Sequence, residues 1–517
     1  MRKISVRPIV FGLPLTLFLI MVTASLIDFE ATRDVTTQIN DWILRTFSDA
    51  FAFSAFAFVV TCIWAFFSPL GRIRIGGRDA VPILSRWNWF GITLTTTIAI
   101  GILFWATAEP MYHLYNPGGL DIEPGSKNAA RFALTSLFMH WSITPYAIYT
   151  VPALTFALVY HNFGARFSIS SPINLLIGRT LPDGVIELID AMCVLSLLFG
   201  LSATLGAGIL SISGGIDRLF GLGTGPLITA LVGVTIVSAF FLSSASGLQR
   251  GIRVLSDINT RGFLALALFV LLIGPTREVL VMGGQALISF TMEFVPRSLL
   301  LAPFNDREWV NDWTVFNWAA WLAWAPMSAM FLGRIAKGYT VREFILVNLL
   351  APAIFSIVWM SIFGGLALQT ELGTPGLLKE SLDLFGPESV LYALVDVLPF
   401  SLPLAAFLVI LSFLSYVTAA DSNTDVLAGI TLNGRPEDIP RSHGVAVKFI
   451  WASVVGISAW VMITFSGIDG IRILSNLGGF PALFIVSAFN LTLIALGTYK
   501  LDKLKEGASG LPSPSLA

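Results

Sequence analysis

The sequence predicts an all-α, polytopic membrane protein with twelve membrane-spanning helices, and three observations lead to this fold class. Of the 517 residues, 55% are hydrophobic and 12% are charged, whereas a soluble domain carries about 25% charged residues. The apolar residues gather in runs that are long enough to cross a bilayer. Between these runs, segments rich in Lys and Arg alternate with segments that hold few of them, which is the pattern expected of a chain that crosses a membrane repeatedly.

Twelve apolar runs of spanning length follow one another along the chain. The first run has the length and the basic flank of a signal peptide, but no small-residue cleavage site follows it, so we take it as the first span. The runs lie near residues 8–27, 50–69, 88–112, 131–160, 186–213, 225–245, 262–282, 314–333, 344–368, 399–420, 446–466 and 474–498.

The distribution of positive charge predicts the orientation. With the N-terminus in the cytoplasm, 21 of the 31 Lys and Arg residues fall on the cytoplasmic side, and every cytoplasmic loop is basic. The positive-inside rule therefore places both termini in the cytoplasm. No basic cluster is dense enough to indicate a nucleic-acid partner. Cys62 and Cys193 lie inside apolar runs, which argues against a disulfide or zinc framework.

The third run ends abruptly at Glu109 and Pro110. An ionised carboxylate in the outer half of the membrane is costly, and it is therefore a candidate functional group. The alternative is that Glu109 simply reaches the water outside. Trp105 and Tyr112 are seven residues apart, so they share one face of this helix.

The fourth run places aromatic side chains around a proline. His140, Trp141, Tyr146 and Tyr149 surround Pro145. Trp141 and Tyr149 are eight residues apart and stay on nearly the same side of a helix. His140 could carry protons, but a structural histidine that bonds a neighbouring carbonyl is the commoner case.

The eighth run carries the densest aromatic pattern in the chain. Trp318, Trp321 and Trp324 recur at every third residue and share one broad helix face. Pro326 predicts a kink or break just beyond them, and a broken membrane helix persists where it lines a cavity or packs on protein. The pattern suggests a pocket for an organic cation. An interfacial tryptophan belt is the alternative, and it suits Trp313 but not the deeper members.

Two further segments carry expectations. Residues 277–312 form the longest outer stretch, and their apolar positions predict an amphipathic helix lying along the outer surface. The tenth run ends with a string of side-chain oxygens that could bind Na⁺, or could cap a helix terminus. These are Thr418, Asp421, Ser422 and Thr424.

Five stretches give the chain a family resemblance. They read FWATAEP at 104–110, HWSITPYAIY at 140–149, SGLQRGIRVLSDIN at 246–259, AADS at 419–422, and WTVFNWAAWLAWAP with FLGRI and GYTVREF over 313–344. Over about residues 8–500 the chain resembles the betaine/choline/carnitine transporter (BCCT) family of bacterial secondary transporters.

The resemblance implies an architecture and a location. It implies a LeuT-like fold with two inverted repeats of five helices, helices 3–7 and 8–12, preceded by two extra helices. The divisions would be residues 1–85, 86–312, 313–500 and a short tail at 501–517. The family implies a homotrimer in the lipid of the bacterial inner (cytoplasmic) membrane, with no cofactor beyond a possible coupling ion.

The resemblance also implies a substrate site. A box of aromatic rings would hold a trimethylammonium group, with Trp324 beside the path and Trp105 and Tyr112 as further contacts. The box members are Trp141, Tyr146, Tyr149 and Trp321. Each cation–π contact contributes about 0.5–2 kcal/mol, so four supply at most about 8 kcal/mol. Micromolar affinity needs roughly 8 kcal/mol after ordering costs.

A second anchor is therefore expected for the substrate carboxylate. Backbone amides at the broken part of the third run, around Ile98, Ala99 and Gly101, would provide it. In relatives this site commonly has a second tryptophan where this chain has Ala320, so the pocket is expected to be wider on that side.

The resemblance leaves the coupling ion open. Thr418 with Ile98 would form a possible Na⁺ site, but one hydroxyl of the relatives' pair is replaced by Ala419. Where relatives have the hydroxyl side chains of a second ion site, this chain has Leu197 and Leu201. Gly101 stands where proton-coupled relatives tend to have an acidic residue. Exchangers of the family use a positive side chain, for which Arg261 is the candidate.

These features predict import of a zwitterionic quaternary ammonium or sulfonium compound, such as glycine betaine, by alternating access. A sodium-independent exchanger of carnitine or betaine is the alternative. An intramembrane enzyme that uses His140 with Glu109 or Asp421 lacks a nucleophile or a metal-ligand pair at useful spacing. A channel would need repeated polar rings along a pore, and the sequence has none.

Overall fold

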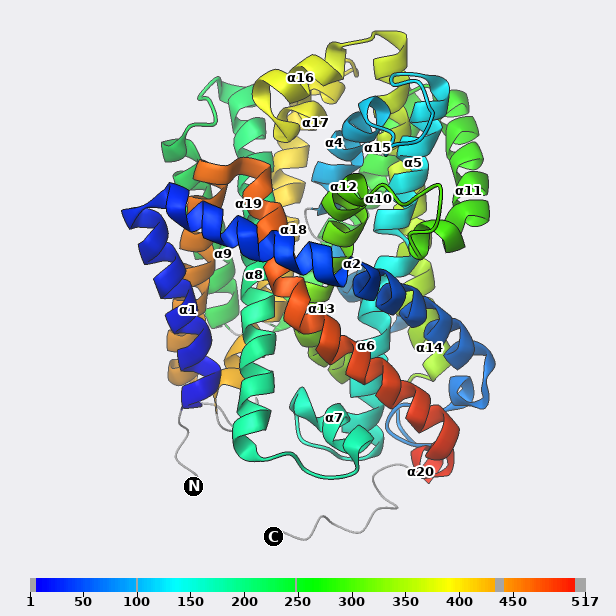
Figure 1. The fold of residues 1–517 in the computed structure, drawn as a ribbon, viewed down its shortest axis with the longest axis vertical. Helices are drawn as coiled ribbons and strands as arrows, with labels where there is room; N and C mark the ends of the chain where they lie inside the picture. The colour runs from blue at the N-terminus through cyan, green and yellow to red at the C-terminus, as the bar shows by residue number, and fades with distance from the viewer. Residues whose placement is uncertain (1–5, 99–100, 247–248, 433–440, 507–517) are drawn as a thin grey trace.

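The structure, a computed structural model, describes residues 6–98, 101–246, 249–432 and 441–506 and is almost wholly helical (Figure 1). Within these ranges the β-type pairing consists of two isolated bridges, Val6 with Leu432 and Arg74 with Thr340. The all-α prediction is therefore confirmed. Figure 1 shows both chain ends at the same end of the bundle, with α16 (Leu377–Phe385) and α17 (Pro387–Asp396) at the other.

Among the described residues, eleven helices are long and apolar enough to cross a membrane, which confirms a polytopic protein. The main helices are α1 (Pro8–Ile27), α2 (Phe29–Phe67), α3 (Arg86–Ile98), α4 (Gly101–Tyr115), α5 (Lys127–Trp141), α6 (Ile143–Asn162), α8 (Asp183–Phe220), α9 (Pro226–Ser246), α10 (Gln249–Ile273), α11 (Thr276–Ser298), α13 (Phe316–Ile335), α15 (Ala351–Gly373), α18 (Ser401–Thr431) and α19 (Arg441–Tyr499). Shorter pieces are α7 (Ser170–Ile177), α12 (Arg307–Trp309), η2 (Val310–Val315), α14 (Val341–Ile345), η3 (Leu346–Leu350) and α20 (Leu501–Glu506).

The predicted number of twelve spans differs from the eleven candidate spans of the structure for three reasons. The third predicted run is described in two pieces, α3 and α4, because residues 99–100 lie outside the described residues, and each piece alone is shorter than a full span. The last two runs form one element, α19, which changes direction at Gly467. The backbone of Gly467 has φ 54° and ψ −130°, a conformation that glycine adopts without a Cβ penalty. Finally, α11 has the length and composition of a span of its own.

Pro326 does not break its helix. α13 is continuous from Phe316 to Ile335, so the predicted break is wrong. A proline removes one amide donor, and neighbouring helices can compensate for that loss in a membrane protein. Every residue of α13 from Trp321 to Gly333 is buried, which gives the helix that support. The irregular backbone lies earlier, in the π-helical turn η2.

α11 lies on the outside of the bundle (Figure 1). It falls within the predicted stretch 277–312, and its side chains Leu280, Val281 and Leu287 are exposed whereas Phe290 is buried. Phe290 packs edge-on against Phe138 of α5. The helix itself is confirmed, and its placement along the membrane surface stays a prediction, as does the division of the chain into repeats.

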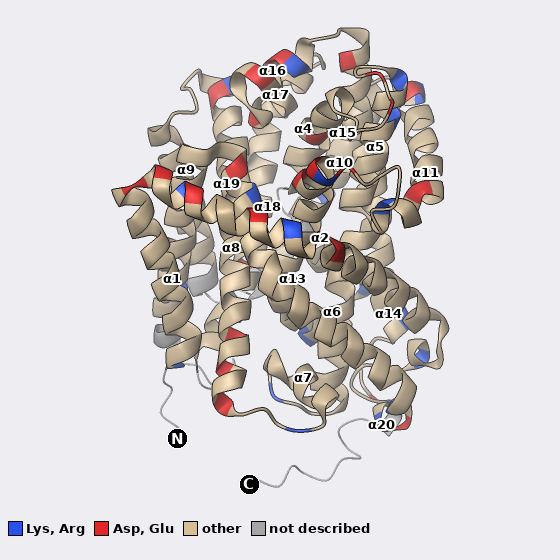
Figure 2. Ribbon diagram, in the orientation of Figure 1, with Lys and Arg blue, Asp and Glu red and all other residues tan. Residues whose placement is uncertain are grey.

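The central helices position the site. α13 packs against α6, α8 and α19 and is enclosed by them. Charges on the helices lie mostly toward the ends, as Figure 2 shows for α8. The uncharged middle of α8 is Ala191–Ile216. An apolar mid-section flanked by charged ends is what a bilayer requires.

Candidate functional site: a buried aromatic cage and its polar support

Four of the predicted aromatic residues meet at Trp321. The ring centroid of Trp321 lies 5.8 Å from that of Trp141, 5.5 Å from Tyr146 and 5.1 Å from Tyr149. All three pairs are edge-to-face, with interplanar angles between 63° and 72°. All four side chains are buried. We call these four residues the aromatic cage.

Pro145 explains why residues so close in sequence all face α13. In a continuous helix the carbonyl of Trp141 would bond the amide of residue 145, but proline has no N–H and its ring would clash with that carbonyl. The chain accordingly ends α5 at Trp141 and restarts at Ile143, with the intervening Ser142 at φ −120° and ψ −111°. This reorientation brings the last residue of α5 and the first two turns of α6 onto the same neighbour.

The cage is closed in this structure. Ring centroids at these separations are in direct contact, so no trimethylammonium group fits between Trp321 and any of its three partners. Admission of such a group requires the rings to separate. A cavity of about 340 Å³ lies elsewhere, between α5, α11 and the loop after it, and is lined by Phe132, Arg297 and Phe304 among others.

Tyr146 has a polar anchor in addition to its ring contact. Its hydroxyl lies 2.9 Å from Oγ of Ser356 on α15. Because a buried hydroxyl without a partner is costly, this bond fixes the tyrosine ring toward Trp321.

Trp324 is placed beside the cage and not in it. It is buried against α8, where a Cβ on Gly200 would lie 2.7 Å from Cδ1 of Trp324. No ring contact among the described residues joins it to the four cage members.

Gly101 is the first residue of α4 and touches the cage through Trp141. A Cβ on Gly101 would lie 2.8 Å from Cη2 of Trp141 and 3.9 Å from Cδ1 of Trp105. Of the other predicted carboxylate contacts, Ala99 and the side chain of Ile98 lie outside the described residues.

Trp105 and Tyr112 share a helix face, as predicted, and meet at a third ring. Trp313 lies 6.0 Å from Trp105 and 5.1 Å from Tyr112, measured between ring centroids. Cζ of Arg472 lies 4.7 Å from the centroid of Trp313. Arg472 was not among the sequence candidates, although an arginine between two apolar runs is an available signal.

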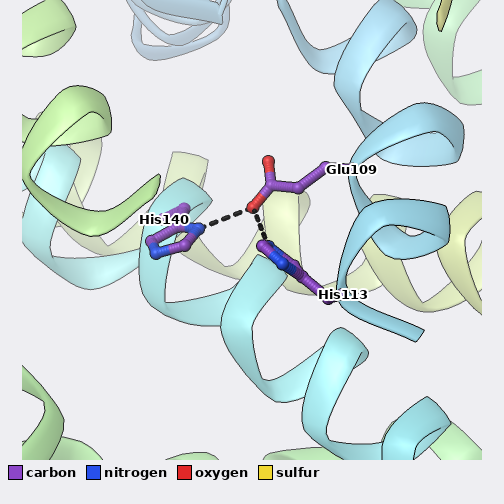
Figure 3. A group of neighbouring side chains, drawn as sticks. All are labelled: Glu109, His113 and His140. Carbon is purple, nitrogen blue, oxygen red and sulfur yellow. Dashed lines mark hydrogen bonds and ion pairs between the residues drawn. The ribbon is translucent and has the colours of Figure 1, made fainter. Parts of the chain in front are cut away.

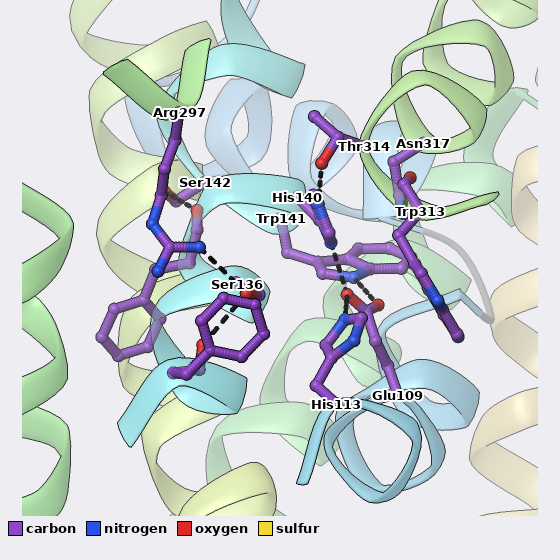
Figure 4. Close-up of polar contacts among 12 residues, drawn as sticks. Glu109, His113, Ser136, His140, Trp141, Ser142, Arg297, Trp313, Thr314 and Asn317 are labelled. Atoms are coloured by element: carbon purple, nitrogen blue, oxygen red, sulfur yellow. Dashed lines mark hydrogen bonds and ion pairs between the residues drawn. The ribbon is translucent and has the colours of Figure 1, made fainter. Parts of the chain in front are cut away.

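Glu109 is fully buried, and Figure 3 shows its carboxylate between His113 and His140. Its Oε1 lies 2.6 Å from Nδ1 of His140 and 3.2 Å from Nε2 of His113. Its Oε2 accepts the indole N–H of Trp141 at 2.8 Å. Nε2 of His140 lies 3.0 Å from Oγ1 of Thr314 in η2 (Figure 4). We call these five residues the Glu109 network.

The network corrects two expectations. Glu109 does not reach outer water, because none of its surface is exposed. His140 does not bond a backbone carbonyl; it bonds the carboxylate and a hydroxyl. Sequence reasoning missed His113, although it follows Glu109 by four residues, the spacing that stacks two side chains on one helix face.

The three ionisable members of the network also have the residue types of a metal site, and their ligand atoms all lie within 4.8 Å of one another. Two ligands of a tetrahedral zinc ion lie about 3.3 Å apart, given bonds of about 2.0 Å. The 2.6 Å separation between Glu109 and His140 is too short for that and is a hydrogen-bond distance. The geometry therefore favours a hydrogen-bonded network.

The tenth predicted run does not end where expected. α18 continues to Thr431, so Asp421 lies within the helix and the capping alternative is wrong. Asp421 accepts a hydrogen bond of 2.6 Å from Ser243 of α9. Thr418 is buried and donates to the carbonyl of Leu414 at 2.8 Å. The side chain of Ser422 lies outside the described residues.

Arg261 lies away from the cage. Its guanidinium is largely exposed and pairs with Asp257 at 3.0 Å, one turn earlier on α10. Asp257 also accepts the indole N–H of Trp87 at 3.0 Å.

Fold and site together define a polytopic helical membrane protein with an aromatic cage enclosed between its helices. The sequence profile described as BCCT, betaine/carnitine/choline family transporter, matches residues 9–498. The chain belongs to this family and is a transporter, not an enzyme.

Individual relatives span nearly the whole chain. Glycine betaine transporter 1 of Vibrio parahaemolyticus is 32% identical over 493 residues, covering 92% of this chain and 90% of its own. A glycine betaine/proline/choline/ectoine transporter of the same organism is 32% identical over 502 residues, with coverage of 94% and 86%. Among solved structures, a Na⁺-coupled sialic acid symporter in a substrate-bound, outward-open state is 12% identical, with coverage of 89% and 86% and a TM-score of 0.49.

Proposed function

We propose that this chain carries a zwitterionic quaternary ammonium or sulfonium compound, with glycine betaine as the first candidate, across the bacterial inner membrane by alternating access. The observation that carries the proposal is the meeting of Trp141, Tyr146 and Tyr149 at Trp321, deep inside the bundle. Electron-rich faces that enclose a permanently charged methylated group provide the usual recognition of such ligands. Relatives named as glycine betaine transporters support the choice of substrate.

The proposal includes a zwitterion and not a simple cation. Backbone amides around Ile98, Ala99 and Gly101 would hold the substrate carboxylate, and Gly101 lies in contact distance of Trp141 of the cage. A substrate with both groups would bridge the rings and the helix end.

Coupling to Na⁺ through Thr418 is part of the proposal. Thr418 is buried on α18, and hydroxyl oxygens are suitable ligands for a hard cation. The alternative of a sodium-independent exchanger finds less support, since Arg261 is engaged with Asp257 at the surface. We also propose a homotrimer with both termini in the cytoplasm. The basic loops support this placement of the termini.

Counterflow of labelled glycine betaine in proteoliposomes tests the proposal. A preloaded carrier accumulates label transiently against its gradient, whereas a channel does not. Competition by a panel of choline, carnitine, ectoine and sulfonium analogues then ranks the substrates. Absence of counterflow with every member of the panel would contradict the proposed function.

Sodium dependence is tested with a matched pair of variants. We expect Thr418→Ala to reduce the ratio of uptake in sodium to uptake in potassium. Thr431→Ala removes a hydroxyl that likewise donates to a carbonyl four residues earlier on α18, and should leave the ratio unchanged. Equal uptake by the wild type in both buffers would refute the sodium site.

A further inference from the structure

The indole of Trp141 is held by two residues of one helix. Glu109 on α4 accepts its N–H at 2.8 Å. Gly101, at the start of α4, lies against the far edge of the same indole, with its Cβ position 2.8 Å from Cη2. The hydrogen bond and this close contact together restrict the indole ring to one orientation. The direction of one cage wall is therefore set by α4, although the residue itself belongs to α5.

The carboxylate of Glu109 is bonded by groups that need not be charged. Within the described chain its partners are two imidazoles and an indole, and no Lys or Arg forms an ion pair with it. Arg297 on α11 lies over Phe132 and is already paired with Glu293 at 2.7 Å. Figure 4 shows this arginine and its bond to Ser136 at a distance from the carboxylate.

The other elements packed on α4 place their charges at its far end. Glu371 of α15 accepts from Tyr115, Lys379 of α16 lies over the Tyr115 ring, and Arg218 of α8 pairs with Asp396 of α17. Arg472 of α19 lies over Trp313, the ring that contacts Tyr112. The groups that face Glu109 itself are therefore His113 and His140.

The two histidines differ in their capacity for a second proton. Both ring nitrogens of His140 have partners, Glu109 and Thr314, so an imidazolium can donate at both. Among the described residues Nδ1 of His113 has no partner, so a proton there would be buried without an acceptor, which is costly. The geometry thus accommodates an added proton at the Glu109–His140 pair.

We propose that Glu109 is a positioning residue for the aromatic cage, and that proton uptake by the Glu109–His140 pair weakens binding of the cationic end of the substrate. This inference rests on the proposed function. With Glu109 ionised, a negative charge lies behind the indole of Trp141. This charge attracts the onium group of the substrate and increases the electron density of the indole ring that faces it. Added protons cancel that charge. Because linkage is reciprocal, substrate binding also lowers the proton affinity of the pair.

The test is betaine affinity as a function of pH in the purified full-length protein, measured by tryptophan fluorescence and by calorimetry. As the pH is lowered from about 8 to about 5, the wild-type Kd should rise by about fivefold or more. Glu109→Gln keeps an oxygen that can accept from Trp141 but loses the charge. Its Kd should be flat with pH and close to the wild-type value at acid pH.

Two further variants separate this role from a merely structural one. His140→Gln should also flatten the pH profile. His161→Gln, on the same helix as Tyr146 but bonded to the carbonyls of Gly333 and Arg334, should keep the wild-type profile. A wild-type profile in Glu109→Gln, or a flat profile in the wild type, overturns this inference alone. No betaine binding by the wild type at any pH overturns the proposed function and this inference with it.

Discussion

The aromatic cage and the Glu109 network share Trp141, but they are built from different interactions. The cage consists of rings in edge-to-face contact, and outside the network its side-chain anchor is the hydrogen bond between Tyr146 and Ser356. Such contacts are worth about 0.5–1.5 kcal/mol each and tolerate displacement. In the network, short polar bonds link α4, α5 and η2, and each bond has a required direction.

This difference assigns separate tasks to the two regions. The rings around Trp321 must part to admit a ligand, and non-directional contacts allow that. The network holds one of these rings in a fixed orientation while the others move. The predictions below remove the cage, the network bond and the supporting contacts in turn.

The largest effect is expected from Trp321→Ala. This change removes the ring common to all three cage pairs and should weaken betaine binding by at least about 30-fold, which corresponds to about 2 kcal/mol. Binding to the purified protein is the measurement. The matched control is Trp460→Ala, since Trp460 bonds the carbonyl of Pro226 at the periphery. Equal losses in both variants would mean that Trp321 acts through stability alone.

Trp141→Phe keeps an aromatic wall and removes the donor to Glu109. A buried carboxylate then loses one of its three hydrogen bonds, at a cost of about 1.5–3 kcal/mol in stability. We expect a lower melting temperature and a smaller loss of betaine affinity than in Trp321→Ala. An unchanged melting temperature would show that the indole N–H contributes nothing to the network.

Gly101→Ala should act on the same indole from its other edge. The added Cβ would overlap Trp141 at 2.8 Å, and such overpacking costs about 1–3 kcal/mol. Displacement of the ring should reduce betaine affinity. Gly184→Ala is the control, because a Cβ there meets no atom within 4 Å. Wild-type affinity in Gly101→Ala would exclude tight contact between α4 and the cage.

Tyr146→Phe should have the smallest effect. The ring that faces Trp321 is retained, and one hydroxyl bond to Ser356 is lost, at about 0.5–1.5 kcal/mol. We expect a change in betaine Kd of about two- to threefold. Ser356→Ala should give a similar change, and the double variant should add little to either. A loss as large as that in Trp321→Ala would indicate that the hydroxyl contacts the ligand.

The family resemblance was sufficient to predict which rings come together. Trp141, Tyr146, Tyr149 and Trp321 are deep in apolar runs, and Pro145 marks the point where α5 gives way to α6. Composition and charge distribution predicted the all-helical, polytopic fold for a related reason, since a bilayer imposes strong constraints on both.

Other features depend on tertiary contacts that no local pattern reveals. Pro326 breaks the helical hydrogen-bond pattern locally, yet the burial of α13 on every side keeps the helix continuous. His140 of α5 reaches the same Glu109 oxygen as His113, a contact between two helices that neither run shows on its own. Arg472 lies over Trp313 from the part of α19 that follows the kink at Gly467.

The most direct test of the account is to locate a bound ligand. An arsonium analogue of glycine betaine carries a heavy atom at the position of the quaternary nitrogen, and anomalous diffraction from crystals of the complex would find it. The account predicts a peak within about 6 Å of the ring centroids of Trp321 and Tyr149, with the carboxylate toward the start of α4. A single strong peak outside the four rings, with the cage still closed, would contradict it.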